Sequence, residues 1–166
     1  MVSQNKTGFS LVELMFVVAI ISLLTSVVLV SLSSARVKSR DAARRSDLYN
    51  IEKALGLYYD KYNTYKVAGT GDAGSGSGWL SYEGGTYVKA VTRGLQEEGF
   101  LTMVLADDPI QSPGYMIFLC ANDKEYAISA TLENSTSDDI SFIQTTCNGS
   151  DAYSTYGKNY SRTNKN

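Results

Sequence analysis

The stretch KTGFSLVELMFVVAIISLL, residues 6–24, places one carboxylate inside an apolar run. The run covers residues 9–32, and Glu13 is its only charged residue. About 20 apolar residues in a helix are enough to cross the hydrocarbon core of a bilayer. An ionisable side chain within such a segment usually marks a function. We therefore expect residues 9–32 to lie in lipid or among many neighbours, with Glu13 as the side chain of interest.

The helix is expected to continue well beyond the apolar run. Neither proline nor glycine occurs between Phe9 and Leu55, so the sequence offers no stop signal there. Residues 33–66 then become amphipathic, with one apolar stripe at spacings of three and four residues. The stripe consists of Leu48, Ile51, Leu55, Tyr58 and Tyr62. One long helix is thus predicted, with a membrane half at residues 9–32 and an amphipathic half at residues 33–66.

The rest of the chain predicts a small globular domain at residues 67–147, which makes the fold class α+β. A glycine-rich loop occupies residues 68–78, and a short helix is predicted at residues 88–98 with Gly99 as its stop. Two strands, 115–120 and 125–133, are predicted to form an antiparallel hairpin, and DISFIQTT (residues 139–146) is a candidate third strand. Residues 148–166 are polar and are expected to be a flexible tail.

Composition removes most enzyme chemistry. The chain has no histidine, which excludes Ser-His and Cys-His nucleophile pairs and every histidine-containing metal site. The net charge of −2 argues against nucleic-acid binding through bulk charge. The two cysteines, Cys120 and Cys147, cannot form a four-thiolate zinc site. Behind a membrane-targeting segment they indicate one disulfide in an oxidising compartment, with two free buried thiols as the alternative.

The motif KTGFSLVEL resembles the processing site of type IV prepilins and of the pseudopilins of type II secretion and competence machines. In that family a charged leader ends in glycine, an aromatic residue follows, and a glutamate is fifth after the cut. Here Lys6, Gly8, Phe9 and Glu13 occupy these places. The later segments GLQEEGFL, ADDP, YMIFL and EYAISATLE also resemble, in order, the short helix, turn and strands of pilin globular domains.

The resemblance implies a fold and a life history. The fold is a long helix on a small antiparallel sheet. A prepilin peptidase would remove residues 1–8 as a leader by cutting after Gly8 and would methylate the amine of Phe9. The subunit would wait as a single-pass protein of the inner membrane. An assembly platform and a cytoplasmic ATPase would then polymerise it into a helical filament at the cell surface or within the envelope.

Glu13 has a physical role in this scheme. A carboxylate in hydrocarbon is costly, and the new ammonium group of Phe9 on a neighbouring subunit could offset it in a dry bundle. We therefore predict that Glu13 sets docking and register between copies. The alternative is a glutamate that reaches the interface from a plain anchor helix.

Two features depart from the family pattern. Many relatives have a helix-breaking proline at the place of Val30, so melting of the helix there is not expected. The second concerns charge: residues 36–45 contain five basic residues and one acid, whereas residues 69–139 contain eleven acids and three bases. Cations beyond the span favour a cytoplasmic globular domain, against the orientation the motif implies. That cationic stretch either meets the acidic surface of a neighbouring subunit or is simply solvated.

Several functions remain open at this point. A surface pilus competes with the pseudopilus of a secretion or competence machine, and the cysteine pair, twelve tyrosines and polar tail favour the pilus. Major pseudopilins often bind calcium near the C-terminus, and the candidate ligands here are Asp107, Asp108, Asp138 and Asp139. No other cofactor is expected. The remaining alternatives are an ordinary signal cut near Ala35 and a single-span membrane enzyme or sensor.

Overall fold

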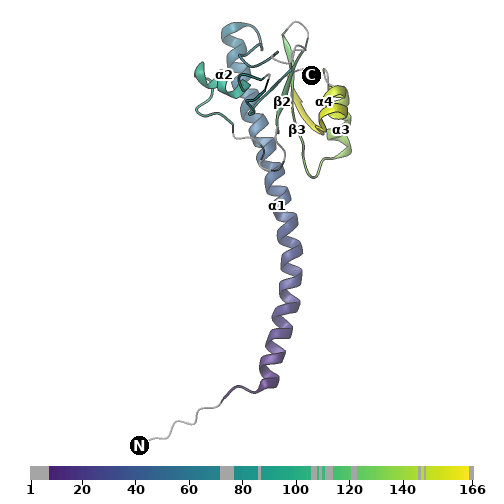
Figure 1. Cartoon of the computed structure of the whole chain (residues 1–166). Coiled ribbons are helices and arrows are strands. Elements are labelled where there is room, and N and C mark those ends of the chain that lie inside the picture. Colours follow the sequence, from purple (N-terminus) through teal and green to yellow (C-terminus); the bar gives the residue numbers. More distant parts are fainter. Residues whose placement is uncertain are drawn as a thin grey trace, which may run out of the picture. The chain divides into compact units, whose positions relative to one another are not determined.

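In the part of the chain that it describes, the computed structural model has one long helix followed by a small antiparallel sheet with three short helices (Figure 1). Contacts divide the chain into two compact units, Met1–Ser39 and Arg40–Asn166. For residues 29, 30 and 149–151 the backbone alone is described. The structure describes residues 8–71, 77–85, 87–105, 108, 110, 114–120, 123–145, 147 and 149–164.

Helix α1, Leu11–Tyr62, confirms the predicted single long helix. Its backbone is helical through position 30, so the helix does not melt there, as expected. The helix ends earlier than the predicted boundary at residue 66, because Asn63 adopts a left-handed φ of 54°. The N–H group of Asn63 donates to the carbonyl of Tyr59 over 2.7 Å. Asparagine tolerates this conformation better than most residues do, so it ends the helix here.

The sheet has four antiparallel strands in the order β1-β2-β3-β4. The strands are β1 Ser77–Trp79, β2 Met116–Cys120, β3 Glu125–Ala130 and β4 Tyr160–Thr163. The predicted hairpin is confirmed, with Ile117 opposite Ile128 in the β2–β3 pair. Strand β1 was not predicted, because residues 77–79 fall in the glycine-rich stretch. Gly78 is needed there: an added Cβ would lie 2.6 Å from the carbonyl oxygen of Gly69.

Both faces of the sheet are covered within the Arg40–Asn166 unit. Alternate residues of β2 point to opposite sides. One core cluster contains Ile117 and Leu119 of β2 with Leu48, Ile51 and Leu55 of α1 and with Val91 and Leu95 of helix α2 (Val91–Glu97). A second cluster contains Met116 and Phe118 of β2 with Trp79 of β1, Ile143 of helix α3 (Ser137–Thr145) and Ala152 of helix α4 (Gly149–Tyr156). Leu48, Ile51 and Leu55 of the predicted apolar stripe therefore join the core, whereas Tyr58 is partly buried against it and Tyr62 is 40% exposed.

Helix α2, Val91–Glu97, is shorter than the predicted 88–98. Val88 lies outside the helix and is 84% exposed, so it does not join the buried face as expected. Glycine is required at position 94 inside the helix, because an added Cβ would lie only 2.6 Å from the carbonyl oxygen of Ala68. Gly99, with φ of 81°, follows the helix as the predicted stop.

The expected third strand at residues 139–146 is wrong. The segment forms helix α3, Ser137–Thr145. Thr136 and Asp139 cap its start reciprocally: the N–H of Asp139 donates to Thr136 Oγ1 over 3.1 Å, and the N–H of Thr136 donates to Asp139 Oδ2 over 2.9 Å. Such a reciprocal cap satisfies two backbone donors at a helix start, and here it outweighs the strand preference of the following residues.

The expected flexible tail at residues 148–166 is also wrong over its described part. Helix α4, Gly149–Tyr156, and strand β4 fold onto the domain, with β4 pairing with β3. The tail has few aliphatic residues, but Ala152 is fully buried and Tyr160 is 8% exposed. The buried Lys158 donates from Nζ to the carbonyl of Gly114 over 3.0 Å. Alanine, tyrosine and a lysine stem thus supply the buried surface that aliphatic side chains usually supply.

Candidate functional site

The start of α1 forms a capping box at Ser10 and Glu13. The N–H of Val12 donates to Ser10 Oγ over 3.3 Å, and the N–H of Ser10 donates to Glu13 Oε2 over 3.0 Å. These bonds satisfy backbone donors that the first helical turn otherwise leaves unpaired. The negative charge of Glu13 also lies at the positive end of the helix dipole. The cap was not predicted from the sequence, although the Ser-x-x-Glu spacing of residues 10–13 is a signal for it.

The expected processing residues lie just before this box. Phe9 is 85% exposed, and Gly8 is exposed outside the helix. An added Cβ at Gly8 would meet nothing within 4 Å. A requirement for glycine at this position would therefore come from outside the folded chain, as it would if an enzyme bound the backbone closely. Lys6 and the rest of the expected leader lie outside the described residues.

Among the residues that the structure describes, none covers the apolar half of α1, and its most apolar stretch of 18 residues is not buried at all. Three hydroxyl side chains in this half, those of Ser22, Thr25 and Ser26, donate to carbonyl groups of the same helix. Ser22 Oγ donates to the carbonyl of Val18 over 2.8 Å, and Thr25 Oγ1 donates to that of Ile21 over 2.7 Å. Because these hydroxyl groups are satisfied within the helix, the segment suits an apolar environment.

The cationic stretch that follows is largely neutralised within the Arg40–Asn166 unit. Arg44, with 4% of its side chain exposed, donates to Asp41 Oδ1 over 2.8 Å and to Glu133 Oε1 over 3.1 Å. It also forms a two-pronged pair with Asp108 through Nε and Nη2. Asp41 in turn accepts the backbone N–H groups of Glu133 and Asn134, each over 2.9 Å. Arg44 is thus the centre of a buried ion network that ties α1 to two distant segments.

Two further arginines of the stretch pair in the same way. Arg40 forms two parallel bonds to Glu133, of 2.6 and 2.7 Å. Arg45 donates to Asp139 over 2.9 Å, and its guanidinium lies 4.2 Å from the centre of the Tyr160 ring. The hydrogen bond from Arg40 is the main reason that the pKa of Glu133 falls to about 2. Both expectations for the stretch, a neighbour's surface or plain solvation, are therefore wrong for its three described ion-paired arginines.

The four calcium candidates do not converge in the described structure. Asp108 is bound by Arg44, and Asp139 is bound by Arg45 while also capping α3. Asp138 is exposed, and Asp107 lies outside the described residues. Within the described part of the chain, no group of three or more acidic, cysteine or histidine side chains is placed to hold a metal ion.

Cys120 and Cys147 form a disulfide, as predicted. Cys120 ends strand β2, and Cys147 lies in the turn region between α3 and α4. The bridge spans 27 residues of sequence. It links the sheet to the layer of α3 and α4.

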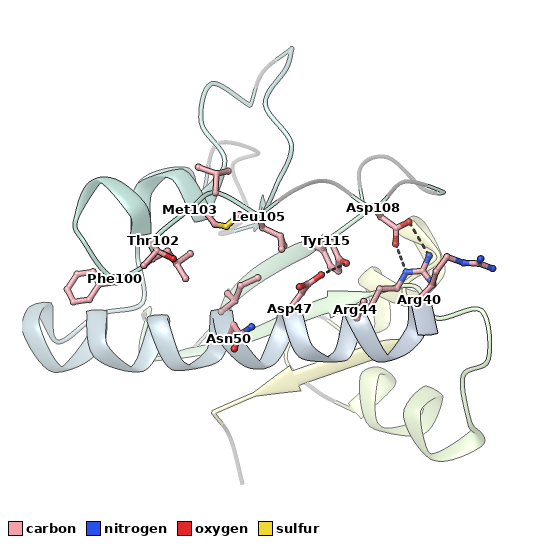
Figure 2. A pocket seen from close by; sticks show the side chains of 14 residues that line it. Arg40, Arg44, Asp47, Asn50, Phe100, Thr102, Met103, Leu105, Asp108 and Tyr115 are labelled. Carbon is pink, nitrogen blue, oxygen red and sulfur yellow. Dashed lines mark hydrogen bonds and ion pairs between the residues drawn. The ribbon is translucent and has the colours of Figure 1, made fainter. Parts of the chain in front are cut away.

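A groove of about 690 Å³ runs beside α1 in the Arg40–Asn166 unit (Figure 2). One wall is the face of α1 that contains Asp47 and Ile51, and the other wall is the segment of residues 100–105. The Arg44–Asp108 pair lies at one end of the groove, and Phe100 lies at the other (Figure 2). The hydroxyl group of Tyr115 donates to Asp47 over 3.0 Å, and burial raises the pKa of both groups. These polar contacts stabilise the wall itself.

Comparison with known proteins finds a family whose motif the start of this chain matches. The model of the prokaryotic N-terminal methylation motif matches residues 3–29, which contain Gly8, Phe9, the capping box and most of the apolar run. No curated protein and no solved structure matches the chain.

Proposed function

We propose that this chain, which carries the class III signal of type IV pilins and pseudopilins, is the structural subunit of a type IV pilus. A prepilin peptidase cuts after Gly8 and methylates the amine of Phe9. An inner-membrane platform and its ATPase then move the subunit from the membrane into a helical surface filament. The pilin-type motif indicates a structural protein rather than an enzyme.

One observation carries the proposal. Most of the exposed apolar half of α1, which holds one acid at its start, lies within the matched motif. Large side chains remain uncovered along its length, among them Leu14, which is 60% exposed, and Leu23, which is 69% exposed. Such a surface needs lipid around the unassembled subunit and other copies around the assembled one, because contact of its apolar side chains with water is unfavourable in either case. A membrane subunit that becomes a filament core meets both needs with the same residues.

Glu13 links the two states. Its Oε2 oxygen caps its own helix, and its Oε1 oxygen is a second acceptor on the same carboxylate. After the cut, the Phe9 ammonium of an adjacent copy can approach that carboxylate. The attraction between the two charges is strong where water is excluded. Each added subunit then offers a new acid and a new cation, so the pairing repeats along the filament.

The choice of a surface pilus rests on the Arg40–Asn166 unit. Its disulfide suits an oxidising compartment, which supports placing this unit outside the cytoplasm despite the cations beyond the span. Asp108 and Asp139, two of the candidate calcium ligands, are held by arginines instead. The competing function is the major pseudopilin of a secretion or competence machine. Deleting the gene separates the two: loss of surface filaments supports the pilus, and loss of protein secretion or DNA uptake with filaments intact supports the pseudopilus.

The test of assembly combines mass spectrometry with electron microscopy. The protein from its host should begin with N-methylated Phe9, and Glu13→Val should abolish filaments while the protein stays in the membrane. Ser22→Ala is the control within the apolar half, because that hydroxyl bonds only to its own helix in the described structure. An intact Met1, an N-terminus at Arg36, or normal filaments from Glu13→Val would contradict the proposal.

A further inference from the structure

Arg36 and Lys38 differ from the other cations of their stretch. Arg40, Arg44 and Arg45 are paired with carboxylates of the Arg40–Asn166 unit. Arg36 and Lys38 belong to the Met1–Ser39 unit and are exposed. Among the described residues, neither has an ion pair. Two positive charges are therefore left for a partner outside the folded chain.

Their position relative to the apolar run indicates where that partner lies. Arg36 follows Leu32, the last large apolar residue of the run, by four residues of helix. At about 1.5 Å per residue, the backbone of Arg36 is roughly 6 Å beyond Leu32 and that of Lys38 roughly 9 Å. The headgroup layer on one side of a bilayer is about 5–8 Å thick. When residues 9–32 cross the membrane, the guanidinium group of Arg36 and the ammonium group of Lys38 can both reach this layer.

The angle between the two side chains favours lipid over a protein partner. Successive helix residues are rotated by about 100°, so Lys38 is rotated by about 200° from Arg36 and the two lie on nearly opposite sides of the helix. A neighbouring protein contacts one side of a helix and would meet one of the two charges. A lipid leaflet surrounds the helix and offers an anion to both. The same helix rotation puts Arg36 and Arg40 on one side, but Arg40 is already bound to Glu133.

We propose that Arg36 and Lys38 bind the phosphate groups of anionic lipids in the leaflet that faces the globular unit. This inference rests on the proposed function, since it requires that residues 9–32 cross a membrane before assembly. We call Arg36 and Lys38 the lipid collar. By binding phosphate groups they fix the depth of the subunit in the membrane before assembly. Glu13 and the lipid collar then mark the two ends of the span with opposite charge.

The test measures lipid selectivity of the full chain in vesicles of phosphatidylcholine with a minor fraction of phosphatidylglycerol. Electron paramagnetic resonance of spin-labelled lipids reports the fraction of each lipid held at the protein surface. The wild type should select phosphatidylglycerol, and Arg36→Gln with Lys38→Gln should remove most of that selectivity, up to about fivefold per charge. High salt should remove it as well, because these charges are exposed.

Lys53→Gln is the matched control. Lys53 is an exposed cation of the same helix but lies in the Arg40–Asn166 unit, with Nζ 4.2 Å from the centre of the Tyr49 ring. Its loss should leave selectivity unchanged. Equal binding of both lipids by the wild type, or full selectivity in the double variant, overturns the inference. Full selectivity with loss of filaments in the double variant would assign the two charges to the acidic surface of a second copy instead.

The failure of the proposed function gives a different signal in this assay. If residues 9–32 do not enter the bilayer, neither labelled lipid shows a restricted fraction, and the proposed function and this inference fall together. If both labels show a restricted fraction but without preference, the membrane span stands and the lipid collar alone is wrong.

Discussion

The two parts of helix α1 differ in whether their apolar and charged side chains find partners within the same chain. From Arg40 to Tyr62 the helix buries Leu48 and Leu55 fully and pairs its arginines with acids of its own globular unit. From Leu11 to Ser39 most of the large apolar side chains that the structure describes are exposed, and Arg36 and Lys38 have no ion pair among the described residues. The C-terminal part buries its apolar side chains and pairs its arginines within one chain, and we propose that lipid or other copies cover the N-terminal part.

This difference separates folding from assembly in the expected effects of substitution. A change in the C-terminal part should lower the stability of the globular unit in a single subunit. A change in the N-terminal part should leave that stability intact and act on partners.

Removing Arg44 should destabilise the globular unit most. Arg44→Met leaves Asp41 and Asp108 buried without their cation, and breaking a buried pair in this way costs about 3–5 kcal/mol. The free energy of unfolding should fall by that amount in denaturant titrations of the full chain in detergent. Arg93→Met is the control, since Arg93 pairs with Glu83 at the surface and its loss should have a far smaller effect.

The same variant also tests whether the two parts of α1 are independent. The Arg44→Met protein should still insert into membranes, because no residue of the apolar half takes part in the ion network. An unchanged free energy of unfolding would mean that the network is not part of the stable fold. Loss of insertion would mean that the two parts of the helix are not independent.

Removing the disulfide should have the next largest effect. Cys120→Ser with Cys147→Ser frees a loop of 27 residues in sequence separation, and the loss of such a bridge costs about 2–4 kcal/mol. The midpoint of denaturant unfolding should shift accordingly, and reduction of the wild type should reproduce the shift. Equal midpoints for oxidised and reduced wild type would contradict this prediction.

How far the sequence could predict these two parts depended on the kind of signal present. The apolar run and the stripe containing Leu48 and Leu55 are periodic signals, and they predicted α1 and the packing of its C-terminal half. Residues 139–146 misled because the apolar content favoured a strand, whereas the start of α3 is fixed by one pair of local hydrogen bonds between Thr136 and Asp139. The Ser10–Glu13 box was not predicted for a related reason. Glu13 was interpreted only as a charge in an apolar segment, whereas it also forms a local hydrogen bond at the start of the helix.

The ion network could not be predicted from the sequence in the same way. Arg44 and Glu133 are 89 residues apart, and Arg44 and Asp108 are 64 apart. No periodic pattern links such positions, so the cations appeared free and the acids appeared available for calcium. The tail was misjudged because burial was sought in aliphatic residues, while β4 uses Tyr160 and the buried Lys158 lies beside it.

Acid should weaken the network in a defined pH range. The pKa of Glu133 is lowered to about 2 from an ordinary 4.5, so the folded state favours the charged carboxylate. The stability it contributes is fully present above about pH 4.5 and is lost as the pH falls toward 2. The stability difference between wild type and Glu133→Gln should therefore shrink over that range. Urea midpoints at successive pH values measure it, and Asp60→Asn controls for the loss of one exposed acid from α1. A constant difference would contradict the pairing with Arg40.

The smallest expected effect lies at the start of the N-terminal part. Ser10→Ala removes the side-chain acceptor of the Val12 N–H but leaves Glu13 in place, and loss of a helix cap costs about 0.5–1 kcal/mol. The Val12 amide should exchange with solvent up to about fivefold faster in micelles, with Ser22→Ala as a control that does not alter the helix start. The free energy of unfolding of the globular unit should not change. Filaments should still form, because the Glu13 carboxylate on which assembly depends remains. Loss of filaments from Ser10→Ala alone would mean that the cap, and not only the charge, positions Glu13 for its neighbour.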